Sequence, residues 1–322
     1  MTVLVTGISG LLGTNLALLL LQRGYTVKGL VRSKSSYKPK PDHRLQLIEA
    51  TLTSDLSVHL MDVDVVVHAA AATRQDLLSY RDYYQINYNA TENVLSAAVK
   101  AGVKKFIYVS TANTIGYGLG APHEIPEHKA MRWPFTKSFY ARSKAAAETL
   151  VLSKQKELTV HIVNPTFMIG PNDSKPSSGK IIMMAMKKRL LFYPPGGKNF
   201  VAVKDVAAGI EQCMRQGING QRYLLAGHNI SFKTFFQLVK TCTGRKQLLL
   251  PIPTWLLLTA GRLGDLLRCL KIKTSLCSNN MHILRVKNYY HNHSSVAALG
   301  MVYQSIEKAI AESVAYFSSR RN

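Results

Sequence analysis

The segment from Val3 to Arg32, VLVTGISGLLGTNLALLLLQRGYTVKGLVR, decides the fold of this chain of 322 residues. It begins with a β-branched run, Val3–Gly7, passes through a glycine-rich turn and an apolar helical stretch, and ends with a second apolar run, Thr26–Arg32. Such continuous apolar runs are typical of strands that are buried on both faces of a parallel sheet. The segment therefore predicts a strand, a tight turn, a helix ending at Gly24 and a second parallel strand.

The glycine-rich turn predicts a site for a phosphorylated ligand. Glycines let the backbone turn tightly and approach phosphate oxygens, and the first N–H groups of the following helix favour negative charge. A strand, a glycine turn and a helix in this order are the arrangement that holds the pyrophosphate of a dinucleotide. The residues that we expect at the pyrophosphate are Gly7, Ser9, Gly10, Leu11, Leu12 and Gly13.

The end of the second strand bears on which dinucleotide binds. A carboxylate at this position would bond the ribose 2′-hydroxyl of NAD, whereas an arginine favours the 2′-phosphate of NADP. Here Arg32 and Ser33 are followed by a basic loop without a carboxylate as far as Lys38. The guanidinium of Arg32 suits a phosphate, and Ser33 adds a hydroxyl. We therefore favour NADP as the cofactor, with NAD as the alternative.

Strands and helices continue to alternate along the chain. Further strands are predicted at 44–50, 62–73, 104–114 and 161–171, with a helix at 86–102. This alternation predicts an α/β fold, a Rossmann doubly wound parallel sheet with a smaller C-terminal α/β substrate-binding region. We expect residues 1–170 to form the dinucleotide-binding core and residues 171–322 to be mainly substrate-binding, with about 199–228 returning to the core.

Two chemically useful side chains lie one turn apart in SFYARSKAAAETL (138–150), which is predicted to be a helix. Tyr140 and Lys144 are spaced i and i+4 and share one helix face. A nearby ammonium favours phenolate, so Lys144 would pull the tyrosine pKa of about 10 toward the range of a working acid or base. Taken by itself, the pair is better explained by accidental packing, because short motifs match often.

Composition excludes several classes of protein. Hydrophobic residues make up 47% of the chain and charged residues 18%, which is typical of a globular protein. The four cysteines form no C-x-x-C pair and lack matching histidines, so no metal site is expected. The net charge of +23 attracts anions in general, but it is spread along the chain and no nucleic-acid motif accompanies it. We therefore expect no nucleic-acid partner.

The longest apolar stretch, LLLPIPTWLLLTAG (248–261), contains two prolines and is shorter than the about 20 residues of a membrane-spanning helix. We expect a core-covering amphipathic helix that begins near Thr254. Weak contact with a membrane surface is the alternative, because basic residues follow at Arg262, Arg268, Lys271 and Lys273. The chain opens without a basic n-region or a cleavage site, so a cytoplasmic location is predicted.

With these segments in place, the chain resembles the extended short-chain dehydrogenase/reductase superfamily, in its epimerase/dehydratase and dihydroflavonol-reductase-like branch. Each motif is loose, but their order and spacing are specific and cover nearly the whole chain. The motifs are TGISGLLG, HAAA, NYNATENV, VSTANT, YARSK, NPTFMIGP and FVAVKDVAAGI. The resemblance makes accidental packing of Tyr140 and Lys144 the minor interpretation.

The resemblance implies roles for individual residues. Tyr140 would exchange a proton with the substrate oxygen, Lys144 would lower the tyrosine pKa and bond the nicotinamide ribose, and Thr111 would hold the same substrate oxygen. Leu52 stands where the adenine-side backbone contact falls. The other residues expected around the dinucleotide are His68, Ala69, Ala70, Asn87, Ser110, Pro165 and Thr166.

The resemblance leaves the reaction open. Dehydration is not expected, because Thr111 is followed by Ala112 and Asn113 rather than by carboxylates. A reductase or dehydrogenase of a carbonyl/alcohol pair is favoured, an epimerase with tightly bound NAD is the alternative, and a non-catalytic dinucleotide sensor is the third option. Asn164 replaces a frequent arginine and weakens the case for a nucleotide-sugar. The substrate is expected to be a small molecule, anionic or a nucleotide-sugar, and a homodimer would fit the family.

Overall fold

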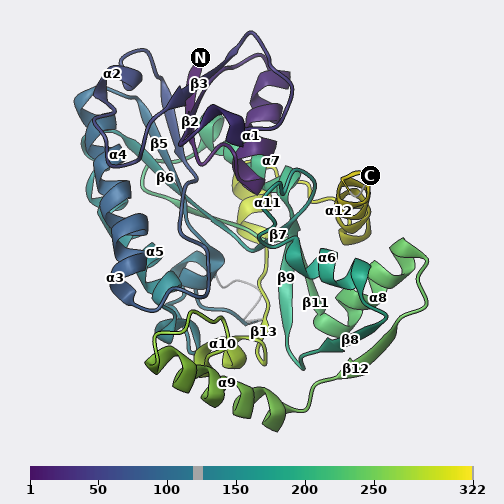
Figure 1. Cartoon of the computed structure of the whole chain (residues 1–322). Coiled ribbons are helices and arrows are strands. Elements are labelled where there is room, and N and C mark those ends of the chain that lie inside the picture. Colours follow the sequence, from purple (N-terminus) through teal and green to yellow (C-terminus); the bar gives the residue numbers. More distant parts are fainter. Residues whose placement is uncertain (119–125, 321–322) are drawn as a thin grey trace.

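The computed structural model describes residues 1–118 and 126–320 and has a seven-stranded parallel sheet at its centre (Figure 1). The strands lie in the order β10-β6-β5-β4-β1-β2-β3. Their bounds are Thr2–Thr6 (β1), Thr26–Val31 (β2), Leu45–Glu49 (β3), Val65–His68 (β4), Lys105–Val109 (β5), Thr159–Pro165 (β6) and Arg222–Leu225 (β10). The order reverses beside β1, so the predicted Rossmann doubly wound sheet is confirmed.

Helices cover both faces of this sheet. One face is covered by α1 (Leu11–Gln22), α7 (Val203–Gln216) and α11 (His293–Leu299). The other face is covered by α2 (Ser57–Leu60), α4 (Ala90–Lys100) and α5 (Phe139–Ser153). Because successive strand residues point to opposite faces, a strand between two helical layers is apolar on both faces, as Val3–Val5 of β1 and Val65–Val67 of β4 are.

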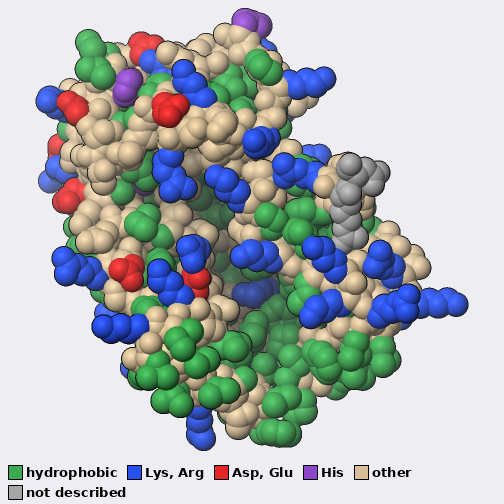
Figure 2. Space-filling model, in the orientation of Figure 1, with side chains coloured by type: hydrophobic (Ala, Val, Ile, Leu, Met, Phe, Trp, Pro, Cys, Tyr) green, Lys and Arg blue, Asp and Glu red, His purple; other side chains and the backbone are tan. Residues whose placement is uncertain are grey.

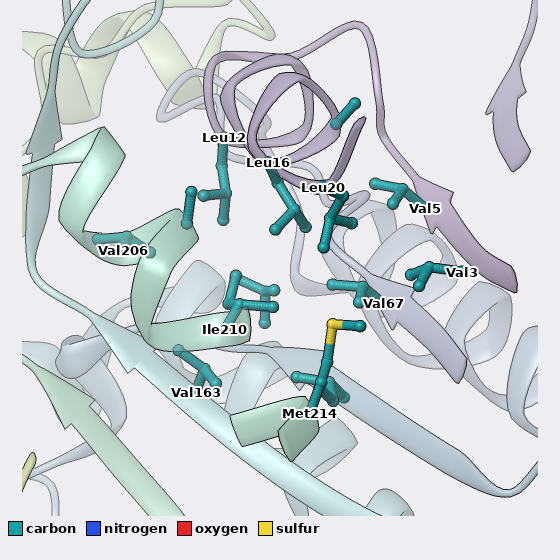
Figure 3. Close-up of a cluster of buried hydrophobic side chains, with 14 of the residues drawn as sticks. Val3, Val5, Leu12, Leu16, Leu20, Val67, Val163, Val206, Ile210 and Met214 are labelled. Atoms are coloured by element: carbon teal, nitrogen blue, oxygen red, sulfur yellow. The ribbon is translucent and has the colours of Figure 1, made fainter. Parts of the chain in front are cut away.

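The layer on the α1 side determines where the glycine turn lies. Figure 3 shows side chains of α1 and α7 pointing toward one another above the strands. The labelled residues are Leu12, Leu16 and Leu20 of α1, Val206, Ile210 and Met214 of α7, and Val3, Val5, Val67 and Val163 of the sheet. This packing holds the first turn of α1 at the carboxyl end of β1, where open α/β sheets bind their ligands.

A smaller region is built around two further sheets. Strands β7 (Phe167–Ile169), β9 (Gly197–Ala202), β11 (His228–Ser231) and β13 (Lys287–Asn288) form the first. Strands β8 (Leu190–Tyr193) and β12 (Leu248–Pro251) form a parallel two-stranded ribbon. Helices α6 (Lys180–Lys187), α8 (Phe232–Thr243) and α12 (Ile306–Ser319) enclose a core that includes Phe200, Phe235 and Phe236.

The prediction of one strand over 161–171 is wrong. Strand β6 ends at Pro165, and β7 begins at Phe167 in the other sheet. The reason lies in Thr166 between them, whose N–H donates to the Leu225 carbonyl while its hydroxyl donates to Asn199. The chain therefore already enters the smaller region before residue 170, whereas α7, β10 and also α11 lie against the main sheet.

Helix α9 (Thr254–Cys269) begins at Thr254 as predicted, but the expectation that it covers the core is wrong. Only Leu257, Gly261 and Gly264 are buried along it. The two glycines bring its backbone against the segment before α10 (Ser278–Ile283), because a Cβ on Gly264 would lie 1.9 Å from the Leu276 carbonyl oxygen. Its large apolar side chains are left on the outside.

The predicted helix at 86–102 is interrupted. Its first residues belong to a π-helical turn (Gln85–Asn89) that directly follows α3 (Tyr80–Tyr84), and α4 forms the rest as far as Lys100. Short 3₁₀ turns occur at Lys34–Ser36, Ala112–Thr114, Pro126–His128 and Phe135–Lys137. Among the described residues, no helix is long and apolar enough to cross a membrane.

Candidate active site

The glycine turn between β1 and α1 is closely packed. Gly7 has a φ of 68°, and a Cβ at this residue would lie 2.8 Å from the Ala70 nitrogen. A Cβ on Gly13 would lie 2.2 Å from the Gly7 carbonyl oxygen, whereas one on Gly10 would lie 3.3 Å from that oxygen. Real Cβ atoms essentially never come within 3.0 Å of such neighbours. Gly7 and Gly13 are therefore required for this turn, and Gly10 has somewhat more space.

The first turn of α1 offers backbone groups to the space above the turn. Gly10 is the N-cap residue of α1, and Ser9 beside it is partly exposed. The side chains of Leu11 and Leu12 are buried in the core, where Figure 3 shows Leu12 pointing toward α7. A contact of these leucines with a phosphate would therefore use their backbone N–H groups, which have no acceptor within the helix.

The end of β2 carries the residues expected at the ribose. Arg32 is exposed directly after β2, and the Ser33 hydroxyl lies 2.9 Å from that of Ser35. The sequence pattern did not reveal a carboxylate on the neighbouring strand. Glu49 ends β3 opposite Val31, and its side chain accepts a hydrogen bond of 3.4 Å from the backbone N–H of residue 34. Arg32 and Glu49 thus provide opposite charges at the same edge of the sheet.

The His68 side chain lies in the interior rather than in the ligand space. Its Nδ1 is 2.8 Å from the Thr6 hydroxyl, and its Nε2 is 2.9 Å from the Thr91 hydroxyl. Burial lowers the pKa of His68 to about 3, so the ring is neutral and connects β1, β4 and α4. Any contact of His68 with a dinucleotide would use the backbone. Ala69 and Ala70 are partly exposed beside the glycine turn.

Two asparagines hold the loops that follow β4 and β3. Asn87 is buried in the π-helical turn, and its side chain accepts from the Ala72 nitrogen at 2.7 Å and donates to the Ser143 hydroxyl at 3.0 Å. Asn93 donates to the Leu52 carbonyl at 2.8 Å. Leu52 is thus held through its backbone. Asn93 was not identified from the sequence, because nothing in its own helix indicates the distant loop.

Tyr140 and Thr111 are brought together from different elements. Thr111 follows β5 and Tyr140 lies in the first turn of α5, and the Thr111 side chain is near enough to act on the pKa of Tyr140. Burial raises the pKa of Tyr140 to about 12, while the Thr111 side chain opposes the rise. The predicted lowering of this pKa is therefore not found, because desolvation outweighs the favourable contacts of phenolate. At neutral pH the phenol is protonated and can donate a proton.

Lys144 is completely enclosed one turn after Tyr140, with 1% of its surface exposed. Its Nζ donates to the Val109 carbonyl at 2.7 Å and lies 4.0 Å from the centroid of the Tyr108 ring. Burial lowers the pKa of Lys144 to about 7, and the negative charge of Glu148 opposes this. The ammonium is thus directed at the end of β5, next to Thr111, and titrates near neutral pH.

Glu148 is a functional candidate that the motifs did not reveal. One of its oxygens, Oε1, accepts from Ser110 at 2.5 Å, from Thr114 at 2.7 Å and from Asn164 at 2.8 Å. The other, Oε2, accepts from the Arg222 guanidinium at 3.2 Å. The carboxylate therefore joins α5 to the ends of β5, β6 and β10. The Ser110 hydroxyl is thus bonded to Glu148 and not directed at a ligand. Asn164 likewise bonds the Glu148 carboxylate.

Pro165 and Thr166 lie where β6 leaves the main sheet. Pro165 is buried, while Thr166 is partly exposed and donates to Asn199 at 2.7 Å. Asn199 in turn donates to Asn229, which binds the backbone of Tyr290, and the Tyr290 hydroxyl donates to the Ala112 carbonyl at 2.8 Å. This chain of hydrogen bonds connects the smaller region to the residue after Thr111.

A cleft of about 400 Å³ lies beside Tyr140. Its lining combines apolar with polar side chains from three parts of the chain. These include Leu77, Tyr83, Trp133 and Phe139 on the apolar side, and Arg268, Asn280 and His282 on the polar side. Tyr140 is thus open to a small molecule that is largely apolar and bears a few polar groups.

The residues present fit a dinucleotide. Because Gly7, Gly10 and Gly13 carry no side chains, the backbone of the turn can approach a pyrophosphate at the N-terminus of α1. Within residues 1–118 and 126–320, no group of three His, Cys, Asp or Glu side chains is placed to hold a metal ion.

Comparison with known proteins agrees with this geometry. Residues 3–226 match the model of the NAD dependent epimerase/dehydratase family. A putative dihydroflavonol 4-reductase of Synechocystis sp. is 30% identical over 98% of this chain and 94% of its own length. Sterol demethylase protein B of Methylococcus capsulatus is 30% identical over 99% of both chains. The crystal structure of gox2253 superposes with a TM-score of 0.83 at 26% identity, over 99% of this chain and 98% of the other.

The chain therefore belongs to the NAD-dependent epimerase/dehydratase family of extended short-chain dehydrogenases/reductases. Proteins of this family use a nicotinamide dinucleotide as NAD or NADP. The family includes reductases and epimerases, so membership gives the class of enzyme and leaves the reaction to the site.

Proposed function

We propose that this family member is an oxidoreductase that interconverts a carbonyl compound and the corresponding secondary alcohol, with Tyr140 as the general acid/base. The observation that carries the proposal is the position of Tyr140. It lines the cleft, lies near Thr111, and its raised pKa keeps it protonated at neutral pH. A protonated phenol is the form that a reductase needs, because a carbonyl oxygen must gain a proton as the carbon is reduced.

Each of the three side chains has a distinct task in this scheme. The Tyr140 hydroxyl donates a proton to the substrate oxygen in reduction and takes it back in oxidation. The Thr111 hydroxyl bonds the same oxygen and orients it. Lys144, whose pKa burial lowers to about 7, holds a proton next to the end of β5 and titrates in the working range of the enzyme. Glu148 is a positioning residue, because it accepts a hydrogen bond from Asn164, which also donates to the Thr111 carbonyl.

The cofactor would be held by the glycine turn and by the end of β2. A bound nicotinamide dinucleotide would supply or accept the hydride. Arg32 supports NADP, because its exposed guanidinium follows β2 where a 2′-phosphate is recognised. Glu49 favours NAD instead, since a carboxylate at this edge suits a free 2′-hydroxyl. We favour NADP because Arg32 follows β2 itself.

One observation supports the epimerase alternative and an anionic substrate. Burial lowers the pKa of Lys198 to about 8, and its Nζ lies 5.2 Å from the centroid of the Phe167 ring, next to Thr166. In the part of the chain that the structure describes, Lys198 forms no ion pair with a carboxylate. A desolvated cation of this kind would be stabilised by an anionic group on the substrate, such as the diphosphate of a nucleotide-sugar.

Three further expectations stay predictions. A non-catalytic sensor would need neither Tyr140 nor Lys144, so their placement at the cleft argues for catalysis. A homodimer through the layer that contains α4 and α5 would fit the family. A cytoplasmic location is expected from the sequence alone.

The proposal is tested by cofactor titration and by turnover. The purified protein is titrated with NADPH and NADH, and NADPH oxidation is then followed with a panel of apolar aldehydes and ketones. Tyr140→Phe is expected to lower kcat by about 10²–10⁴-fold while leaving the Kd of NADPH unchanged. Tyr80→Phe, on the neighbouring helix α3, is the matched control and should keep full activity.

The outcomes separate the alternatives. Full activity of Tyr140→Phe would refute its role as the acid/base. NAD⁺ that survives gel filtration with the protein, together with epimerisation of a nucleotide-sugar, would replace the reductase by the epimerase. Dinucleotide binding without turnover of any substrate would favour the sensor.

A further inference from the structure

Helix α9 turns its large apolar side chains toward solvent. Trp255 is 66% exposed, and Leu263 and Leu266 are each 59% exposed. With Leu256 and Leu270, these residues recur at the spacing of one helix face. The exposed stripe therefore runs along the whole length of α9 and is not a scatter of single residues.

Two polar side chains of α9, Asp265 and Arg268, are directed toward the protein, whereas Thr259 and Arg262 are exposed. Asp265 accepts a hydrogen bond of 3.0 Å from the Ser278 nitrogen, and Arg268 donates to the Leu77 and Thr274 carbonyls. Both residues line the cleft beside Tyr140. A surface helix of a globular protein normally buries its apolar stripe and exposes its polar face. In α9 the large apolar side chains are exposed instead, and a contiguous exposed apolar stripe marks a surface that an apolar partner can cover.

The apolar surface continues onto the β8–β12 ribbon, which directly precedes α9 in the chain. Leu190 and Phe192 of β8 are exposed on one face, and Leu248 of β12, which pairs with Leu190, is exposed beside them. Figure 2 shows hydrophobic side chains gathered along the lower edge of the molecule, over α9 and β12. We call the exposed residues of α9 and of this ribbon the apolar edge.

Basic residues flank the apolar edge. Because β8 and β12 are parallel and in register, the exposed basic residues that precede each strand lie at the same end of the ribbon. They are Lys187, Lys188 and Arg189 before β8, and Arg245 and Lys246 before β12. At the other end of the edge, Lys271 and Lys273 are exposed after α9.

Acidic residues are almost absent from this half of the chain. Between Glu211 and Glu307 the only carboxylate is Asp265, whose side chain is bonded to Ser278 on the inner side of α9. Residues 212–306 carry 12 lysines and arginines and one carboxylate, so this stretch contributes +11 of the net charge of +23. The positive charge is spread along the chain, but its density is highest in the stretch that carries β12 and α9.

We propose that the apolar edge docks on the surface of an anionic lipid bilayer. Leucine, phenylalanine and tryptophan side chains would enter the headgroup boundary, and the flanking lysines and arginines would bind lipid phosphates. A second copy of this chain is the weaker candidate for the occupant. A two-fold contact through the same edge would place its basic flanks against one another without carboxylates to pair with them.

Docking would also bring the active site close to the lipid. Arg268 and Asp265 line the cleft from the inner side of α9, while Leu263 and Leu266 face outward. The cleft is therefore separated from the docked surface by one helix, about 10 Å across. The docking itself does not depend on the proposed oxidoreductase function and is measured without turnover.

Vesicle co-sedimentation tests the proposal with the full chain. Phosphatidylcholine vesicles are compared with vesicles that contain about 30% phosphatidylglycerol, at low and high salt. We expect binding to the anionic vesicles that weakens with salt. Leu263→Gln combined with Leu266→Gln should weaken this binding by about tenfold or more. Lys271→Glu combined with Lys273→Glu should do the same through charge alone.

Matched controls carry the same changes on other parts of the surface. Val58→Gln with Met61→Gln, at residues that are also highly exposed, should leave vesicle binding unchanged, as should Lys100→Glu with Lys156→Glu. Circular dichroism checks that each variant is folded. Equal binding to neutral and anionic vesicles overturns the proposal. A wild-type dimer that the leucine variant converts to monomer, with no vesicle binding, overturns it in favour of a second copy.

Discussion

Buried Lys144 should make the stability of the protein depend on pH, and a variant that lacks this lysine separates its effect from that of the other titrating groups. Burial lowers the pKa of Lys144 from 10.5 to about 7. Such a difference between the unfolded and folded chain corresponds to about 5 kcal/mol. Above pH 7 the unfolded chain binds this proton and the folded chain does not, so the free energy of unfolding rises with pH. The loss of stability caused by burying charged Lys144 is complete below pH 7, and it disappears as the pH approaches 10.5.

The measurement compares the wild type with Lys144→Met by urea unfolding at several pH values. Other titrating groups are common to both proteins and cancel in the difference. Between pH 7 and pH 9 the wild type should gain about 2 to 3 kcal/mol of stability relative to Lys144→Met. Lys156→Met, at an exposed lysine, is the matched control. Its free energy of unfolding should differ from that of the wild type by the same amount at every pH.

A difference that stays constant from pH 7 to pH 9 would refute this reasoning, and so would one of opposite sign. Glu148 provides a second check, because its negative charge opposes the lowering of the Lys144 pKa. The comparison is repeated in proteins that also carry Glu148→Gln. There the stability gained by the protein that keeps Lys144, relative to Lys144→Met, should begin to rise at a lower pH. An upward movement would show that the two groups are not coupled as described.

Three further results are expected. Gly13→Ala should weaken NADPH binding about tenfold or more in calorimetric titration, because its Cβ would lie 2.2 Å from a backbone oxygen, whereas Gly10→Ala, at 3.3 Å, should bind nearly normally. Glu148→Gln should lower the free energy of unfolding by about 2 to 4 kcal/mol in urea, because a carboxylate that accepts four hydrogen bonds is replaced by an amide. Arg32→Ala should raise the Kd of NADPH about 10- to 100-fold and leave that of NADH within twofold, and equal effects on both would contradict a 2′-phosphate contact.

The first βαβ unit was predictable because its elements are determined by nearby residues. Val3 and Val5 are apolar where a buried strand must be, and Gly7 and Gly13 stand where a side chain would collide with backbone. The junction after β6 was not predictable in the same way. Pro165 and Phe167 are both compatible with one strand, and only the contact of Thr166 with Leu225 ends it.

The site shows the same division between local and distant information. Tyr140, Lys144 and Glu148 recur every four residues, so the helix spacing alone places them on one face. The spacing does not reveal that the carboxylate meets Arg222, which arrives on β10 from far along the chain. It also does not reveal the depth of burial, which raises the pKa of Tyr140 where a lowering was expected and lowers the pKa of Lys144.

The same three residues explain why a proton can leave this site at low cost. Glu148 is buried but forms an ion pair with Arg222, so its charge is compensated whether or not Lys144 is protonated. Removing either member of a buried ion pair leaves an uncompensated charge and is strongly unfavourable. Neutral Lys144 leaves no such charge behind and can still contact the ring of Tyr108. Lys144 can therefore change protonation near neutral pH, and it does so one helical turn from the phenol that moves the substrate proton in the proposed reaction.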